Sequence, residues 1–161
     1  MQELTLLGGV SQILNRLRRR MRTGVYSRRP LEILRLEVAL ASRHVCCDWF
    51  IRPADEWDQC LSASARVKLQ SQQVLQDALL MRALIFQHFP EIRTTDLCAF
   101  RQAEGGTREL ILTGAMQRDD EMPSSVRSLA MRAHLFGFQF MQNDGVLCAL
   151  PFDGVRSKPR R

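Results

Sequence analysis

The sequence contains no long apolar run, which excludes one broad class of protein. A helix that crosses a bilayer needs about 18 to 20 consecutive apolar residues. The longest candidate, ALLMRALIF at 78–86, is much shorter and is interrupted by an arginine. Hydrophobic residues make up 45% of the chain and charged residues 25%, which is ordinary globular usage. We therefore expect a soluble chain with no transmembrane segment.

The sequence also lacks the short motifs of common enzymes and metal sites. It has no G-x-S-x-G, no Walker phosphate loop, no G-x-G-x-x-G and no C-x-x-C pair. Its three histidines are scattered, whereas zinc sites normally show closely spaced ligand pairs. We therefore predict a non-enzymatic protein with no catalytic residue, no cofactor and no metal.

The five cysteines are odd in number, and no secretory signal precedes them. We interpret them as reduced, small core hydrophobes, which predicts a cytoplasmic location. Cys46 and His44 are two positions apart in a predicted strand, so their side chains point the same way. A thiol packed against a helix or a partner is the commoner outcome of such a pattern, and we favour it over nucleophilic catalysis.

Lysine is nearly absent, and the placement of the arginines is uneven. Residues 1–30 carry seven arginines against one glutamate, and residues 152–161 carry four basic residues against one aspartate. The body between them, residues 31–151, therefore has a net charge of −3 although the whole chain has +6. This asymmetry indicates an anionic partner at the two ends rather than a basic groove on the fold.

Residues 1–30 are predicted to form a basic amphipathic helix or arm. Apolar residues recur there at intervals of three and four, the period of one helix face. This stripe is the predicted docking surface for a partner and consists of Leu7, Val10, Leu14, Leu17 and Met21. The candidate anion-binding residues, in this segment and in the C-terminal tail, are Arg16, Arg18, Arg19, Arg20, Arg22, Arg28, Arg29, Arg156, Lys158, Arg160 and Arg161.

Nucleic acid is the favoured anionic partner, because a guanidinium group binds phosphate oxygens through two hydrogen bonds at once. We expect contact without sequence specificity, since the chain has no recognised nucleic-acid-binding motif. An acidic protein or an anionic membrane surface would also suit a helix with one apolar and one arginine-rich side. A mitochondrial transit peptide has a similar composition.

The alternative function comes from a different class. In this alternative, the chain is a protein–protein adaptor or a subunit of a larger complex. That complex is either a homo-oligomer or a hetero-oligomer. It docks through the N-terminal apolar stripe and a long helix predicted in the body.

Residues 31–52 show a period of two, which is the pattern of half-buried strands. We predict an antiparallel hairpin from LRLEVAL and VCCDWFIR, with Arg52 on the same side as Cys46 and Asp48. Pro53 ends the second strand, because proline cannot donate a ladder hydrogen bond.

The long helix is predicted to follow this hairpin. Asp55 is a suitable cap, and the helical pattern continues to Pro90. Because this span is long, the alternative is two helices broken near residues 62–64. The polar residues 71–73 predict an exposed turn or a bend. The predicted apolar stripe of the helix consists of Leu61, Ala65, Leu69, Leu75, Leu79 and Phe86.

Two further hairpins and a helix complete the predicted domain. Glycines at 105–106 and at 145 mark tight turns between apolar runs, since glycine reaches positive φ readily. A helix over 126–136 lies between the two hairpins, and Gly137 is placed to end it.

The predicted fold class is therefore α+β. It is a mainly antiparallel sheet built from two ββα units plus a C-terminal hairpin, with the helices on one face. A basic amphipathic N-terminal helix precedes it. We divide the chain into an N-terminal arm (1–30), a single α+β domain (31–151) and a basic flexible tail (152–161).

Overall fold

A computed structural model of the chain describes residues 15, 31–53, 59–122 and 124–151. Within these ranges the strands are β1 (Glu32–Ala39), β2 (His44–Phe50), β3 (Thr94–Gln102), β4 (Arg108–Gln117), β5 (Phe138–Asn143) and β6 (Val146–Cys148). They form one six-stranded sheet in the order β1-β2-β3-β4-β5-β6. Neighbouring strands are antiparallel except β2 and β3, which are parallel.

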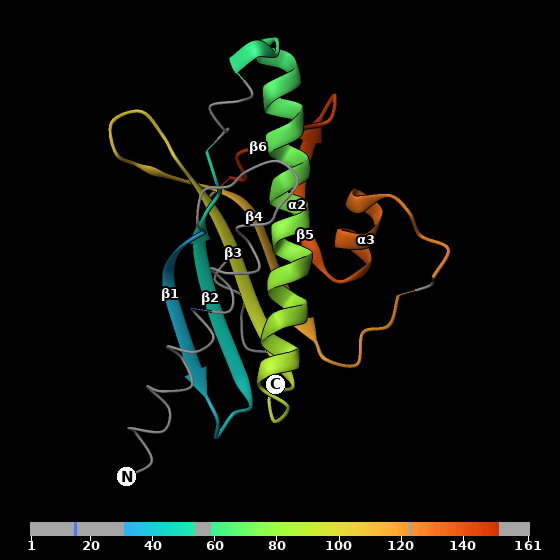
Figure 1. The fold of residues 1–161 in the computed structure, drawn as a ribbon. Coiled ribbons are helices and arrows are strands. Elements are labelled where there is room, and N and C mark those ends of the chain that lie inside the picture. The colour runs from blue at the N-terminus through green and yellow to red at the C-terminus, as the bar shows by residue number, and fades with distance from the viewer. Residues whose placement is uncertain (1–14, 16–30, 54–58, 123, 152–161) are drawn as a thin grey trace.

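The helix α2 (Ala63–His88) connects the two parallel strands. Parallel neighbours cannot be joined by a tight turn and need a long crossover, which α2 supplies. Figure 1 shows α2 lying along one face of the sheet, with the shorter helix α3 (Leu129–Leu135) beside it. α3 also contacts β5. The predicted α+β class and the order ββα, ββα, ββ are thus confirmed.

The predicted turns and helix end are present, and their backbone angles explain why those residues stand there. Asp144 and Gly145 have φ of 47° and 80° and join the paired residues Asn143 and Val146. Two positive φ values in a two-residue loop match the twist of a β-hairpin. Gly137, with φ of 92°, follows Phe136, the C-cap of α3, and this is the position where a left-handed helix ending needs glycine.

The start of the long helix was predicted too early. α2 begins at Ala63, and the Ser62 side chain accepts a hydrogen bond from the Ala65 amide at 3.2 Å, which satisfies one otherwise unpaired donor. Leu61 therefore precedes the helix and is 40% exposed instead of joining an apolar stripe. The break near residues 62–64 agrees with the alternative prediction, whereas Asp55 lies outside the described residues.

The polar residues 71–73 lie inside α2, so the predicted turn or bend there is wrong. Ser71 and Gln73 are buried. The Ser71 hydroxyl accepts a hydrogen bond from the Leu147 amide of β6 at 2.9 Å. The side chain therefore satisfies a strand donor, which explains why a polar residue is buried at this position.

Arg52 was predicted to share a face with Cys46 and Asp48, and this is wrong. β2 ends at Phe50, so the alternation of side-chain directions does not extend to Arg52. Its guanidinium is buried against α2, where it forms an ion pair with Asp77. The pair joins the end of β2 to the middle of the long helix.

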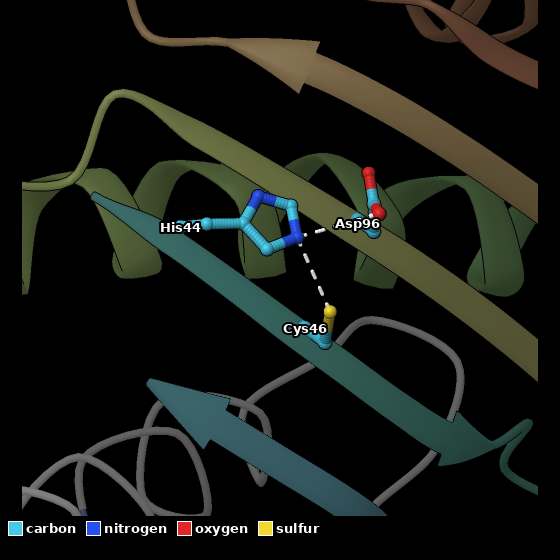
Figure 2. A group of neighbouring side chains, drawn as sticks. All are labelled: His44, Cys46 and Asp96. Atoms are coloured by element: carbon cyan, nitrogen blue, oxygen red, sulfur yellow. Dashed lines mark hydrogen bonds and ion pairs between the residues drawn. The ribbon is translucent and has the colours of Figure 1, made fainter. Parts of the chain in front are cut away.

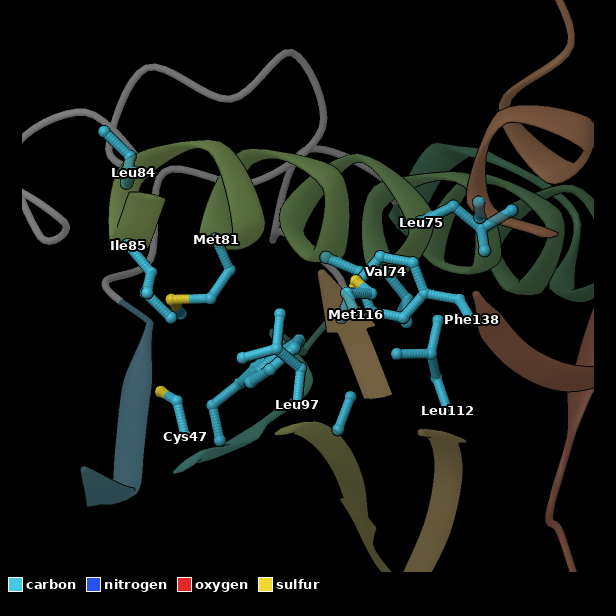
Figure 3. Close-up of a cluster of buried hydrophobic side chains, with 14 of the residues drawn as sticks. Cys47, Val74, Leu75, Met81, Leu84, Ile85, Leu97, Leu112, Met116 and Phe138 are labelled. Carbon is cyan, nitrogen blue, oxygen red and sulfur yellow. The ribbon is translucent and has the colours of Figure 1, made fainter. Parts of the chain in front are cut away.

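The hydrophobic core lies between α2 and the sheet. Figure 3 shows Met81 and Ile85 of α2 directed toward Cys47 and Leu97 on the strands, and Val74 of the same helix close to Met116. Cys47 is buried, which confirms the core interpretation for this cysteine. The other four are half-buried or exposed, so that interpretation was wrong for them. All five are free thiols.

The N-terminal and C-terminal predictions fall on residues that the structure does not describe, apart from the helical Asn15. They comprise the whole stripe Leu7, Val10, Leu14, Leu17 and Met21 and every candidate anion-binding residue from Arg16 to Arg29 and from Arg156 to Arg161. Among the described helices, none has the length and apolar character needed to span a bilayer.

Candidate functional site

Three side chains with different donor atoms converge on the face of the sheet opposite α2. His44 and Cys46 come from β2, and Asp96 comes from β3 (Figure 2). The His44 Nε2 atom lies 3.2 Å from Cys46 Sγ and 3.3 Å from Asp96 Oδ2. All three donor atoms lie within 4.8 Å of one another, a grouping that could hold a metal ion. We call these residues the His–Cys–Asp cluster.

The sheet itself positions this cluster. Val45 and Cys47 point into the core, so the residues on either side of them in β2 point to the opposite face. The parallel register of β2 and β3 places Cys46 beside Asp96. Strand alternation supplies the first two side chains of the cluster, and strand pairing supplies the third.

The His44 ring is held at both nitrogens. While Nε2 faces Cys46 and Asp96, Nδ1 lies 2.8 Å from the hydroxyl oxygen of Thr94, the register partner of His44. A neutral imidazole carries one proton, so one nitrogen donates and the other accepts. If Nδ1–H donates to Thr94 Oγ1, the lone pair of Nε2 points at the other two members of the cluster.

The surroundings of Cys46 stabilise its protonated form. Partial burial raises the pKa of the Cys46 thiol above its ordinary value, and the negative charge of Asp96 raises that pKa further. Arg35 opposes this shift with a smaller effect. A nucleophilic cysteine needs the opposite environment, because the thiolate is the reactive form.

A second polar group lies next to the cluster on the same face. Asp48 accepts from Arg35 Nε at 3.0 Å, and Cys98 Sγ lies 3.3 Å from Thr113 Oγ1. Burial raises the pKa of both the Asp48 carboxyl and the Cys98 thiol. Asp48 and Cys98 are register partners two positions further along β2 and β3 than Cys46 and Asp96. They repeat the aspartate–cysteine pair of the cluster but have no histidine beside them among the described residues.

The sequence alone indicated two of the three residues of the cluster. The spacing of His44 and Cys46 was visible, but Asp96 was missed because β2 and β3 had not been assigned as neighbours. The available signal was the long helix between the two hairpins, which is typical of a crossover between parallel strands. The arginines predicted as site residues lie outside the described ranges, so the structure does not relate them to the cluster. No protein-family model, no curated protein and no solved structure matches this chain.

Proposed function

We propose that this chain is a non-enzymatic binding protein whose arginine-rich terminal segments contact an anionic partner, with nucleic acid favoured. The observation that carries the proposal is the separation of charge along the chain. The described part of the body holds twelve basic and twelve acidic residues, so its charges balance. The segments 1–30 and 152–161 hold eleven basic and two acidic residues.

Several arginines of the body are already used to hold the fold. Arg101 contacts Glu109 at 2.7 Å across β3 and β4. Arg118 donates to the carbonyl oxygens of Phe86 and Ile92 at 2.9 and 2.7 Å. Arg82 donates to a carbonyl oxygen at the end of β4. These side chains have structural partners, which supports assigning anion binding to the terminal arginines instead.

The proposal predicts a specific dependence on salt. Each phosphate that an arginine neutralises releases condensed counterions, so the logarithm of the association constant falls linearly with the logarithm of salt concentration. The slope is about −0.9 per contact on duplex DNA and about −0.7 on single strands. Because phosphate contacts carry no base information, affinity should vary little with sequence.

Two matched triple variants of the full chain test this proposal. Arg16→Gln/Arg18→Gln/Arg19→Gln removes three charges from the N-terminal segment, and Arg43→Gln/Arg108→Gln/Arg127→Gln removes three exposed charges from the body. Binding to a labelled DNA duplex and to a single-stranded RNA is measured by fluorescence anisotropy at several salt concentrations. We expect the first variant to reduce the duplex slope by up to about three and the second to leave it unchanged. Equal effects of the two variants would refute the proposal.

The adaptor or subunit function is the second candidate, and one structural observation favours it. Met131 and Leu135 lie one turn apart on α3 and are 54% and 49% exposed. The long helix is less suited to docking, because much of its apolar surface already packs in the core. Light scattering at low and high salt separates the two functions. Self-association that survives high salt supports the adaptor, since apolar contacts are not screened.

A cytoplasmic location remains part of the proposal. All five cysteines are free thiols, as expected in a compartment that keeps thiols reduced. Fluorescence microscopy of the tagged chain in its native cell would test the location directly. Targeting to another compartment by residues 1–30 would favour the transit-peptide reading of that segment.

A further inference from the structure

We propose that the His–Cys–Asp cluster is a binding site for one zinc-class divalent cation, separate from the terminal segments. The three ligand atoms would be His44 Nε2, Cys46 Sγ and a carboxylate oxygen of Asp96. Water would take the fourth position. The inference rests on the geometry of β2 and β3 and does not depend on the proposed function.

The donor set selects the class of ion. Imidazole nitrogen, thiolate sulfur and carboxylate oxygen are the three donor types that zinc accepts in proteins. Magnesium and calcium prefer oxygen donors throughout, and iron–sulfur clusters need several cysteines. A mixed set with one atom of each kind therefore favours Zn²⁺, with Co²⁺ as its spectroscopic substitute.

Two of the three ligand separations are close to those around a tetrahedral ion, and the third, between Cys46 Sγ and the Asp96 carboxylate, is at most 4.8 Å. Zinc bonds of about 2.0 to 2.3 Å at tetrahedral angles place neighbouring ligand atoms roughly 3.3 to 3.8 Å apart. The separations of Nε2 from Sγ and from Oδ2 are 3.2 and 3.3 Å, which is within a few tenths of an ångström of that range. Small side-chain rotations would suffice, and the two strands that carry the ligands are fixed by a continuous ladder.

Thr94 is a second, independent observation that points to a metal. Histidine ligands usually donate their other ring N–H to an oxygen, which fixes the tautomer and aims the ligating lone pair. Thr94 Oγ1 lies 2.8 Å from His44 Nδ1 and is placed to accept that hydrogen bond. In this tautomer the Nε2 lone pair would face the Asp96 carboxylate, and a cation between them removes the repulsion.

The charges around the cluster also favour a cation. Glu37 of β1 is the register partner of Cys46, and Asp48 lies two positions further along β2. The nearby basic side chain is Arg35, which is paired with Asp48 at 3.0 Å and lies 3.8 Å from Glu37. When the proton of the neutral His44 ring is on Nδ1, Asp96 faces the unprotonated Nε2 atom and has no cationic partner among the described residues.

The test uses the full chain in a non-thiol reductant. Zn²⁺ binding is measured by isothermal titration calorimetry, and Co²⁺ binding is followed by absorption spectroscopy. We expect one ion per chain and a thiolate-to-cobalt charge-transfer band. Changing an outer partner of a metal ligand typically weakens binding by about 10- to 100-fold. Thr94→Val should fall in that range, and His44→Gln, Cys46→Ser and Asp96→Asn should exceed it.

Matched controls separate this site from the other thiols and carboxylates. Cys98→Ser and Asp48→Asn change the same residue types on the same face, and Cys60→Ser removes the exposed thiol. All three should keep the charge-transfer band. Cys98→Ser and Cys60→Ser should also keep the affinity, whereas Asp48→Asn should weaken binding less than Asp96→Asn does, because Asp48 acts only through its charge. Circular dichroism of every variant reports whether it folds. The proposal fails if folded wild-type chain binds no ion, if Co²⁺ shows no thiolate band, or if Cys98→Ser or Cys60→Ser abolishes that band.

The same measurements distinguish a purely hydrogen-bonded cluster. In that case Nε2–H donates to Asp96 and the Thr94 hydroxyl donates to Nδ1, with no ion involved. Titration of the wild-type chain would then show no saturable Zn²⁺ binding, which overturns the proposal. The Arg16→Gln/Arg18→Gln/Arg19→Gln variant should bind zinc as the wild type does, so failure of nucleic-acid binding leaves this test unaffected.

Discussion

Arg52 and Asp77 form a two-point ion pair in the interior of the protein. Arg52 Nε lies 2.9 Å from Asp77 Oδ2, and Arg52 Nη2 lies 2.5 Å from Asp77 Oδ1. The residues are 3% and 2% exposed. Gln73 also donates to Asp77 Oδ1, at 2.6 Å. Each charge has a fixed partner where water cannot replace it.

Removing one member of this pair should be severely destabilising. Arg52→Met leaves the Asp77 carboxylate buried without its counter-charge, and such losses typically lower the free energy of unfolding by about 3 to 5 kcal/mol. The double variant Arg52→Met/Asp77→Leu removes both charges and should recover most of that loss. Urea denaturation of the wild type, both single variants and the double variant measures the coupling. Additive effects would contradict a direct interaction.

Arg118 should stabilise the end of α2. Its guanidinium donates to the carbonyl oxygens of Phe86, Phe89 and Ile92, and the last carbonyls of a helix have no partner within the helix. A hydrogen bond from a charged group contributes about 1.5 to 3 kcal/mol to the free energy of unfolding. The three bonds share one guanidinium group, so their contributions do not add fully. We expect Arg118→Met to lower the free energy of unfolding by about 2 to 4 kcal/mol. Arg127→Gln, an exposed change, is the control and should be nearly neutral in thermal denaturation.

Cys47 should make stability fall at alkaline pH. Burial raises the pKa of its thiol from 9.0 to about 12 in the folded chain. Below pH 9 both states keep this proton, so the shift has no effect. Between pH 9 and 12 the unfolded state loses the proton while the folded state retains it, and unfolding is favoured by up to about 1.4 kcal/mol per pH unit.

The alkaline effect can be assigned to Cys47 by comparison with Cys47→Ala. We expect the free energy of unfolding, measured by urea denaturation at pH 8, 9 and 10, to fall less steeply above pH 9 in the variant. The other thiols contribute equally to both proteins, so the difference reports on position 47. Identical pH slopes would show that the folded thiol is not protected from ionisation.

Gly114 should not tolerate a side chain. A Cβ atom built on it would lie 3.0 Å from Phe138 Cδ1 and 3.1 Å from the Gly137 carbonyl oxygen. The backbone contact cannot move away without disturbing the pairing of β4 with β5. We expect Gly114→Ala to lower the melting temperature, with a loss of about 1 to 3 kcal/mol from overpacking. A melting temperature equal to that of the wild type would mean that β5 shifts freely.

The features that the sequence predicted correctly are local. A period of two, a turn residue with positive φ and a helix-ending glycine act within a few positions, so the hairpins and the end of α3 were found close to their observed places. The start of α3 was predicted three residues too early, because Ser128 caps the helix. The cap of α2 was misplaced because Asp55 and Ser62 are both good N-caps, and local preference does not choose between them. Arg52 was misplaced because its direction depends on Asp77, which lies on another element.

The candidate site was predicted only in part, for the same physical reason. His44 and Cys46 are related by strand alternation, which a sequence displays directly. Asp96 reaches them through the register of two strands, and that register is fixed by packing across the whole sheet. Terminal basic residues remain a prediction from charge alone, because they lie outside the described ranges.

The parallel pairing of β2 with β3 has a consequence for the order of assembly. His44 and Thr94 touch across this pair although they are fifty positions apart in the chain. The hairpins can close early, but this pair forms only after α2 has brought the two halves together, because closing a longer loop loses more entropy. A cation bound across that late contact is expected to slow unfolding more than it speeds folding. The lifetime of the folded state would then depend on the concentration of the available cation, whereas the folding rate would not.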